Sequence, residues 1–406
     1  MYLTISKRFE ISSSARLWAP NWSAPRNLSA FGPASQAEHG CGFNYVVHFV
    51  FNGPVERDTG MMINVVTIKD RIKPLLDGRY DHKFLNSDCG SLQGRVPTAE
   101  NLARLWLAKM RPLFDDVAAK PVVCHVQDSL TSEATAYADG HVERHHWVSF
   151  SAARRTSSPH LSDAENEALF GVAASKAGHG HNYRLRVTLD GPPDDVTGLI
   201  AEYDQTAAAF KAIRAELDHK NLNIEVPALA NLPATTESLA QFVFGRLSGF
   251  LPMARVRLYE LTEFFAEYDK NRQFGLGIIQ TFHAAHRLHS AALDDAHNLD
   301  VYGKCNNPLG HGHEYQVEAT LGGDYDERTG TMFDFVSFNQ ALADSLQPWA
   351  YKHLDLDTDD FTGVASTGEN IVAKLWPRLD DLIDHRLMRL RLWETPNNRF
   401  TLRRET

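Results

Sequence analysis

The chain has 406 residues, of which 43% are hydrophobic and 23% are charged, and its formal net charge is −10. This acidic balance argues against a general nucleic-acid-binding protein, which needs a basic face, although a local basic pocket can still hold an anionic small molecule. The first fifteen residues lack the apolar core of a signal peptide, and no uninterrupted apolar run is long enough to cross a bilayer. We therefore expect a cytoplasmic protein without a membrane partner.

Three successive segments of the chain have the same order of predicted elements. Each begins with two apolar stretches that alternate like strands and are separated by a long loop, as in residues 315–321 of the third segment. Two helical patterns follow, as in residues 98–106 of the first segment, where Thr98 is a plausible N-cap. A final strand pair includes residues 256–260 in the second segment. The order ββααββ, with helices gathered on one face of an antiparallel sheet, predicts an α+β fold.

Fixed spacings indicate that these segments are copies of one unit. The motif His-Gly-His occurs at 311–313 and at 179–181, and in both copies a glycine lies 19 residues after the first histidine. The same spacing places Cys41 and Phe43 opposite the two histidines. No Pro- or Ser-rich linker separates the copies, so they should pack side by side. The predicted units one, two and three cover residues 1–140, 141–272 and 273–406.

Unit three carries candidate metal ligands. His311 and His313 are two residues apart on a predicted strand, so both imidazoles point to the same face. His286 ends the preceding strand, and a hairpin-like pairing would bring it alongside. Three histidines without a fourth protein ligand are typical of a catalytic zinc ion, which keeps one position open. Cys305 lies six residues before His311, and a thiolate beside a metal can act as a base, whereas the other three cysteines are interpreted as buried apolar residues.

Residues 303–313, Gly-Lys-Cys-Asn-Asn-Pro-Leu-Gly-His-Gly-His, closely resemble the core motif of the 6-pyruvoyl-tetrahydropterin synthase family. The spacing from cysteine to His-Gly-His is more similar to that enzyme than to 6-carboxytetrahydropterin synthase, whose cysteine is usually nearer. Residues 366–370 and 393–398 also resemble family segments. The resemblance covers unit three with high specificity, unit two well and unit one weakly. It implies the T-fold, in which three units close an antiparallel barrel with the helices outside and two such rings stack.

The resemblance also implies roles for single residues. The residues that would bind Zn²⁺ are His286, His311 and His313. Cys305 would transfer the proton, and Glu394 would anchor the pterin ring with help from Glu369 and Thr367. A carboxylate suits this task because the 2-amino-4-oxo edge of a pterin presents adjacent N–H donors.

The family's active site also uses an Asp–His pair, which comes from a neighbouring unit. Unit three lacks this pair, because residues 349–354 read Trp-Ala-Tyr-Lys-His-Leu. The other units keep the pair but have lost metal ligands, with Arg154 for the first histidine of unit two and Gln127 for the anchoring glutamate of unit one. The retained pairs are Asp81–His82 and Asp218–His219. One chain could join the metal half of unit three to one of these pairs; alternatively, the pairs survive only as helix-end turns.

The function implied by the resemblance is a zinc-dependent lyase of tetrahydrobiopterin biosynthesis. It would act on 7,8-dihydroneopterin triphosphate, eliminating triphosphate with internal redox and no nicotinamide cofactor. A second interpretation keeps the pterin but forms a 6-carboxy- or 6-hydroxymethyl-pterin, and a third is a non-catalytic pterin- or purine-binding protein. The sequence leaves open the product, the unit that supplies the Asp–His pair and the triphosphate ligands, for which Lys304 and Arg287 are candidates. Because three units fill one ring, a homodimer of two stacked pseudo-trimeric rings is expected, with twice the 45.5 kDa chain mass.

Overall fold

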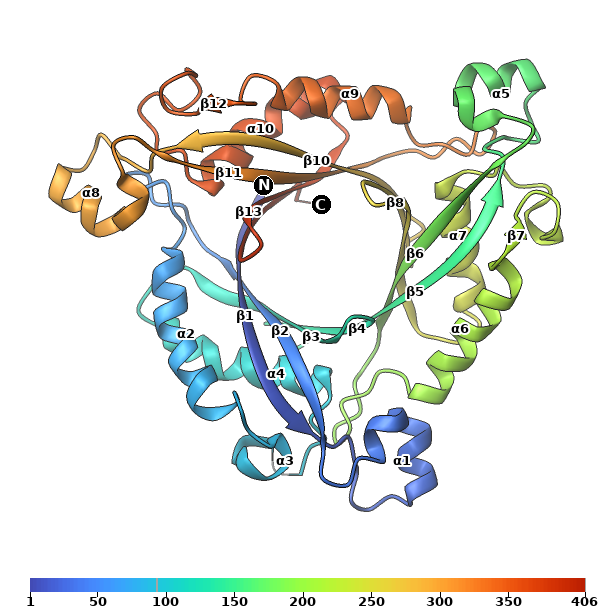
Figure 1. The fold of residues 1–406 in the computed structure, drawn as a ribbon, viewed down its shortest axis with the longest axis horizontal. Helices are drawn as coiled ribbons and strands as arrows, with labels where there is room; N and C mark the ends of the chain where they lie inside the picture. Colours follow the sequence, from blue (N-terminus) through green and yellow to red (C-terminus); the bar gives the residue numbers. More distant parts are fainter. Residues whose placement is uncertain (93, 406) are drawn as a thin grey trace.

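The computed structural model describes residues 1–92 and 94–405, and it forms a closed antiparallel barrel of 12 long strands covered by helices on the outside (Figure 1). Each joint between units is an antiparallel strand pair, with β4 against β5, β9 against β10, and β14 against β1. The last pair unites the two ends of the chain and closes the ring. The predicted α+β fold of three repeated units is therefore confirmed.

Each unit supplies four strands of the barrel and two outer helices. Unit one consists of strands β1 (Tyr2–Ala15), β2 (Cys41–Asn52), β3 (Lys120–Ser129) and β4 (Ser132–Tyr137) and helices α2 (Val65–Arg79) and α4 (Ala99–Met110). Unit two consists of strands β5 (Val142–Arg154), β6 (His179–Asp190), β8 (Met253–Leu261) and β9 (Phe264–Asp269) and helices α6 (Tyr203–Leu217) and α7 (Thr236–Leu247). Unit three consists of strands β10 (Phe274–His286), β11 (His311–Gly322), β13 (Leu387–Thr395) and β14 (Asn398–Arg403) and helices α9 (Phe335–Leu346) and α10 (Gly368–Leu382).

Short elements mark the three corners of the ring. A helix that the sequence patterns did not predict lies between the two long strands of each unit; these helices are α1 (Ala24–Phe31), α5 (Asp163–Phe170) and α8 (Asp295–Tyr302). The remaining short pieces are α3 (Leu85–Asp88), β7 (Lys220–Asn221) and β12 (Lys352–His353). β7 and β12 pair in parallel with the outer ends of β5 and β10. Figure 1 shows one such group at each corner.

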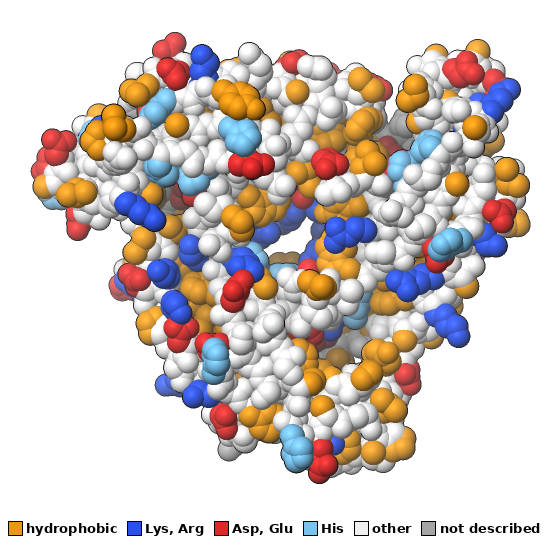
Figure 2. Space-filling model, viewed as in Figure 1, with side chains coloured by type: hydrophobic (Ala, Val, Ile, Leu, Met, Phe, Trp, Pro, Cys, Tyr) orange, Lys and Arg blue, Asp and Glu red, His pale blue; other side chains and the backbone are white. Residues whose placement is uncertain are grey.

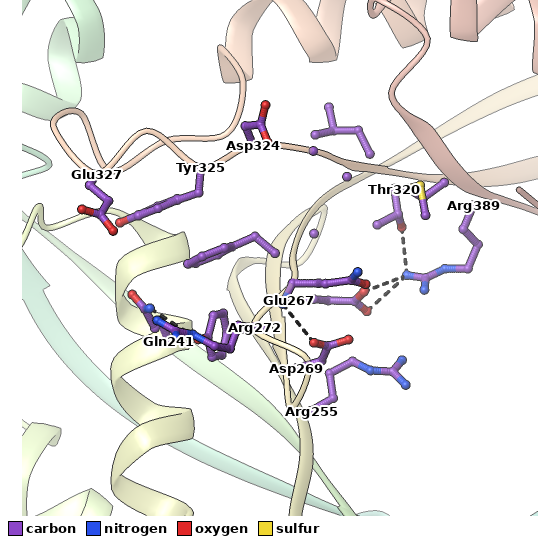
Figure 3. Close-up of a pocket in the computed structure, with 18 residues that line it drawn as sticks. Gln241, Arg255, Glu267, Asp269, Arg272, Thr320, Asp324, Tyr325, Glu327 and Arg389 are labelled. Atoms are coloured by element: carbon purple, nitrogen blue, oxygen red, sulfur yellow. Dashed lines mark hydrogen bonds and ion pairs between the residues drawn. The ribbon is translucent and has the colours of Figure 1, made fainter. Parts of the chain in front are cut away.

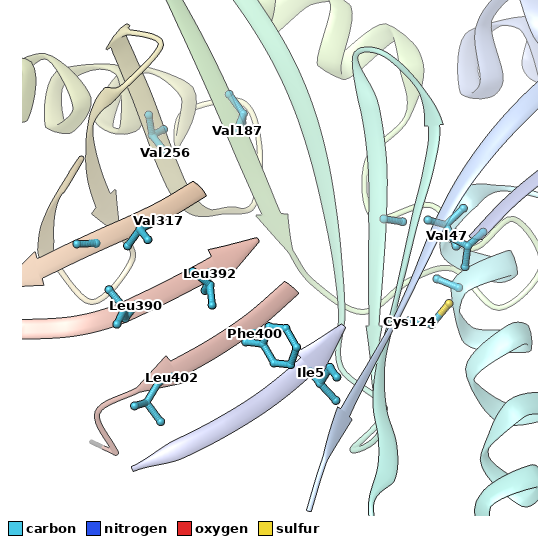
Figure 4. Packing of buried hydrophobic residues seen from close by; sticks show 14 of the residues in the cluster. Ile5, Val47, Cys124, Val187, Val256, Val317, Leu390, Leu392, Phe400 and Leu402 are labelled. Atoms are coloured by element: carbon cyan, nitrogen blue, oxygen red, sulfur yellow. The ribbon is translucent and has the colours of Figure 1, made fainter. Parts of the chain in front are cut away.

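The outward face of the sheet is apolar and forms one continuous core with the helices. On β11, Val317 and Leu321 point to this outward face and are fully buried, whereas Glu318 and Thr320 between them are buried on the lumen side. Figure 4 shows Val47, Val187 and Val317, one from each unit, in the same layer of buried side chains. Because a single cluster of buried residues spans all three units, the units stabilise one another rather than folding as independent beads.

The first residues of one outer helix in each unit hold the next unit in place. The threonine before the helix caps its first turn and donates its hydroxyl to a backbone carbonyl of the following unit. These contacts run from Thr98 to Thr197 at 2.7 Å, from Thr235 to Gly330 at 2.6 Å and from Thr367 to Gly60 at 2.7 Å. Unit three therefore faces unit one, unit one faces unit two, and unit two faces unit three.

The inward face of the sheet lines a central opening, which the space-filling view shows with Lys and Arg side chains around it (Figure 2). Within the described residues, no helix is long and apolar enough to span a membrane.

Candidate metal centre and its pocket

The three histidines of unit three meet at the end of the β10–β11 strand pair where the connecting segment 287–310 begins and ends. His286 and His311 are directly opposite each other, and His313 is opposite Ala284, so all three imidazoles lie on the outward face. The Nε2 atoms of His286 and His311 are 3.2 Å apart, and one ligand atom from each of the three rings lies within 4.8 Å of the others. The register therefore brings together the residues that the sequence spacing predicted as ligands.

The surroundings of these rings suit a bound zinc ion. Nδ1 of the fully buried His286 donates to the carbonyl of Ser366 at 2.9 Å, which turns the Nε2 lone pair toward the other two rings. Burial lowers the pKa of His286 to about 4, and burial also lowers the pKa of His311, so both rings are neutral, as ligands must be. Nε2 of His313 has no hydrogen-bond partner in the described part of the chain. Three imidazole nitrogen donors, one of them oriented by the Ser366 carbonyl, fit a tetrahedral zinc site with one open position.

Two carboxylates line the same pocket. On β13, Oε1 of Glu394 lies 3.9 Å from the Nε2 atoms of both His286 and His313. Glu369, in the first turn of α10, is buried and accepts a hydrogen bond from the backbone N–H of Met62 in unit one at 2.9 Å. Burial, reinforced by the charge of Glu394, raises the pKa of Glu369 to about 7. The half-buried Glu394 thus lies beside the imidazoles, and Glu369 adds a carboxyl group that is partly protonated at neutral pH.

Cys305 lies in a short 3₁₀ turn, Gly303–Asn306, between α8 and β11, and is half-buried. Burial raises the pKa of its thiol, the charge of Glu394 raises it further, and Lys304 opposes both effects. The carbonyl of Cys305 accepts a hydrogen bond from the backbone N–H of Leu288 at 3.0 Å, which holds this turn beside the end of β10 where His286 lies. Unit one also contributes a cation, because Lys7 on β1 lies within electrostatic range of Glu394 and donates to Asn398 at 2.8 Å.

The retained Asp–His pairs lie elsewhere. Asp81 accepts a hydrogen bond from Ser12 N and Asp218 accepts one from Ser151 N, both at 2.8 Å, so each pair is held against the first long strand of its own unit. In Figure 1, α3 follows the first pair at the bottom and β7 follows the second at the right, whereas α8 marks the metal centre at the upper left. Each pair is thus held at the corner of its own unit, and the joining of the metal half of unit three to one of these pairs stays a prediction.

The turn that carries the pair has a structural role of its own. His82, His219 and the matching Tyr351 of unit three all have positive φ, at 55°, 58° and 60°. Each of their backbone N–H groups donates to the carbonyl of a residue on the adjacent long strand. Unit three keeps this turn without the Asp–His pair, so the turn does not require the catalytic residue types.

In unit two, a buried arginine occupies the position of the first metal-binding histidine of unit three. Arg154 is opposite His179, in the register of His286 and His311, and its buried guanidinium is ion-paired with Glu260 and bonded to Thr236 at 3.0 Å. His181 Nε2 lies 2.8 Å from the other oxygen of Glu260. Glu260 has the place that Glu394 has in unit three. The guanidinium thus takes the position of the first metal ligand, but its Nε and Nη1 have no hydrogen-bond partner among the described residues, and His179, His181 and Glu260 still offer ligand atoms within 4.8 Å of one another.

In unit one, the strand register corrects the predicted counterpart of Glu394. Val47 pairs with Val126 as Val317 pairs with Leu392, so Asp128, two residues further on, stands where Glu394 does, and Gln127 faces the lumen. Arg144 of unit two lies 3.4 Å from Asp128 and 3.2 Å from the buried Glu100. The pocket of unit one is thus also filled by an arginine.

One histidine near the metal centre was not predicted. His353 packs so closely on Gly310, the residue before His311, that a Cβ at this glycine would clash with its Nε2. Its Nδ1 lies 3.8 Å from Asp355, which accepts a hydrogen bond from Ser366 at 3.0 Å. Both ring nitrogens lack a hydrogen-bond partner among the described residues. The sequence could have indicated this residue, because His353 is the only histidine in the segment of unit three that matches the Asp–His motif.

The family model for 6-pyruvoyl tetrahydropterin synthase matches residues 4–139, 145–271 and 276–405, which together exceed half of the chain. This chain belongs to that family. The human 6-pyruvoyl tetrahydrobiopterin synthase is 38% identical over 120 residues, which are 29% of this chain and 83% of the human protein. The Drosophila melanogaster protein of the same name is 41% identical over 122 residues, covering 29% of this chain and 73% of its own. The structure of the Caenorhabditis elegans 6-pyruvoyl tetrahydropterin synthase, 33% identical, covers 32% of this chain and 95% of its own, with a TM-score of 0.32.

Family membership and three repeats across the chain are thus established. Each matched relative corresponds to about one unit, so this chain carries three family units in one polypeptide.

Proposed function

We propose that this chain is a zinc-dependent lyase of the 6-pyruvoyl-tetrahydropterin synthase kind. Its substrate would be 7,8-dihydroneopterin triphosphate, from which it eliminates triphosphate with internal redox. The observation that carries the proposal is the cluster of three imidazoles in unit three, with Glu394 beside it and the turn of Cys305 held next to it. Pure binding of a pterin needs neither the imidazole cluster nor the thiol.

Different residues of this chain would have different roles in the proposed reaction. A bound zinc ion would supply Lewis-acid polarisation of the oxygens on the substrate side chain. Cys305 would accept a proton from the neighbouring carbon. Burial raises the pKa of its thiol, and a cation nearby, such as the bound metal, would lower that pKa and favour the thiolate. His286 is held in one orientation by the Ser366 carbonyl, so the ligand geometry is set before substrate binds.

Recognition of the pterin falls to the two carboxyl groups. Glu394 would accept the paired N–H donors of the 2-amino-4-oxo edge, a bidentate arrangement that a carboxylate matches well. Glu369, with a pKa near 7, would share a proton with a ring heteroatom, while Thr367 fixes the start of α10 against unit one. The substrate would thus lie between unit three and unit one.

A specific observation favours a second candidate, which keeps the pterin but forms a 6-carboxy- or 6-hydroxymethyl-pterin. Unit three lacks the family's Asp–His pair, and His353 is the histidine in the matching segment of that unit. A different proton-transfer group would change the fate of the intermediate.

We also propose a homodimer of two stacked rings in the cytoplasm. The side chains of His82 and His219 are each 82% exposed, so a second ring can contact these Asp–His pairs. Light scattering should give twice the chain mass of 45.5 kDa, and three or six chains would refute the dimer.

The deciding experiment is incubation of the zinc-loaded protein with 7,8-dihydroneopterin triphosphate, followed by mass identification of the product. The 6-pyruvoyl product with free triphosphate supports the first proposal, and a 6-carboxy- or 6-hydroxymethyl-pterin supports the second. Tight binding without turnover would make the protein a pterin-binding protein. A Cys305→Ala variant is the matched control, since it should keep the metal and lose turnover.

A further inference from the structure

The lumen of the barrel contains more arginine than carboxylate where β8, β9, β11, β13 and β14 meet. The residues of this lumen cluster are Arg257, Arg389, Arg391 and Arg399, with Glu267 and Glu318 as their carboxylates. Four cations therefore face two anions on the inner face of a protein whose overall charge is negative. Such an excess is costly because the low-dielectric wall of the barrel screens repulsion less than water does.

The two carboxylates are already shared. Glu318 lies 3.0 Å from Arg257, 3.4 Å from Arg389 and 2.8 Å from Arg391. Glu267 lies 2.5 Å from Arg257 and 3.1 Å from Arg389. Arg399 has no carboxylate within 4.0 Å in the part of the chain that the structure describes; its nearest aromatic partner is Trp393, at 5.8 Å. The existing ion pairs therefore leave positive charge uncompensated.

The guanidinium groups also have unused donors that face one another. The Nε atoms of Arg389, Arg391 and Arg399 are buried and lack hydrogen-bond partners among residues 1–92 and 94–405. Arg389 stands directly opposite Arg403 on β14, and Arg399 is a diagonal neighbour of Arg391. Like charges in these positions destabilise a sheet unless something lies between them. Burial together with the neighbouring arginines lowers the pKa of Arg399 to about 10, which leaves it charged at neutral pH.

The cluster can be reached from solvent. The central opening in Figure 2 has Lys and Arg side chains around it. A cavity of about 720 Å³ at the junction of units two and three is lined by Arg255, Thr320 and Arg389, and Figure 3 shows Arg389 directed at Glu267 and Thr320. Arg389 and Glu267 are the members of the lumen cluster that line this cavity, so the cluster is open to solvent on their side.

We propose that the barrel lumen binds a small multivalent oxyanion of the phosphate class, held by Arg389, Arg391 and Arg399. Forked guanidinium groups match tetrahedral oxyanions bidentately, whereas a monatomic anion uses only one donor of each fork. A doubly charged anion would neutralise the positive charge that Glu267 and Glu318 do not compensate. It would also accept hydrogen bonds from the unpaired Nε–H donors of the arginines. The lumen site is separate from the metal centre, which lies on the opposite face of the sheet.

Calorimetric titration of the full chain with inorganic phosphate tests the site, at pH 7 and at constant ionic strength set with sodium chloride so that general screening is matched. We expect saturable binding of phosphate to wild type and at least about tenfold weaker binding by Arg399→Gln, which removes one charge-assisted fork. Arg399→Lys keeps the charge without the fork and should fall between the two. Arg95→Gln, at an exposed position outside the lumen, should bind like wild type.

A His311→Ala variant separates the lumen from the metal centre, because phosphate held by a metal ion would lose its site there while lumen binding would persist. If Arg399→Gln folds poorly, thermal unfolding of wild type and Arg399→Lys with and without phosphate gives the same answer, since a ligand of the folded state raises Tm. The proposal is overturned if phosphate and chloride act alike at equal ionic strength, if Arg399→Gln and wild type bind phosphate equally, or if His311→Ala abolishes binding.

Discussion

Replacing Arg154 by histidine should create a second metal site in unit two. Arg154 and His179 are opposite each other as His286 and His311 are, and His181 completes the pattern two residues on. The carbonyl of Ala234, just before the capping Thr235, matches the Ser366 carbonyl that orients His286. The new imidazole would therefore find both its fellow ligands and its orienting acceptor in place.

The size of the effect follows from the ion pair that is lost. Arg154 is 3% exposed and, with the contact from His181, keeps the pKa of Glu260 at about 2. Removing one partner of such a buried pair costs about 3–5 kcal/mol, so metal-free Arg154→His should be less stable than wild type by this amount. Zinc at 100 times its Kd should return about 2.7 kcal/mol. Wild type should show no zinc-dependent change attributable to unit two.

The assay is metal analysis of the purified protein combined with urea unfolding at several zinc concentrations. Arg154→His should carry two zinc ions per chain where wild type carries one. Arg154→Met is the matched control, because it loses the same ion pair without supplying a ligand, and it should stay at one zinc ion. One zinc ion in Arg154→His, with unfolding independent of zinc, would show that the register does not define the site.

Four further outcomes are expected. His311→Ala should release the single zinc ion and abolish turnover while cooperative unfolding persists, which metal analysis and circular dichroism will check. Cys305→Ser should keep the zinc ion and lower turnover by about 10²–10⁴-fold, measured as product formed per chain. Burial raises the pKa of Glu237 from 4.5 to about 7. Its contribution to the free energy of unfolding is therefore complete below pH 4.5 and is lost as the pH rises through 7. In Glu237→Gln, the fall in the free energy of unfolding between these pH values, measured in urea, should be smaller by on the order of 3 kcal/mol. His82→Ala and His219→Ala should each leave zinc content unchanged, and a loss of turnover in only one of them would identify the Asp–His pair that serves the metal centre.

The sequence predicted the repeated unit and the three histidines because both depend on local periodicity. A spacing of 25 residues between His286 and His311, with His313 two further on, requires only that two strands pair at their ends. Thr98 was likewise predicted as an N-cap from its place before a helical pattern, and its side chain accepts from Asn101 N as expected.

What the sequence did not predict depends on closure of the ring. Gln127 was misassigned because the segment between helix and strand differs in length between units, and only the pairing with β2 identifies Asp128. The place of Asp218 relative to the metal centre required knowledge of which corner each turn occupies. The arginines of the lumen come from strands far apart in sequence, such as Arg257 and Arg391, so no window of sequence shows that they converge on Glu318.

Covalent linkage of the three units changes what a substitution can do. In a ring of identical subunits, each replacement is made at three positions at once, so an arginine like Arg154 would close every pocket together. In this chain the same residue closes one pocket and leaves the pocket of unit three intact. Because the three units differ in sequence, the residues of each pocket can change or be lost separately, while the barrel that the units share stays closed.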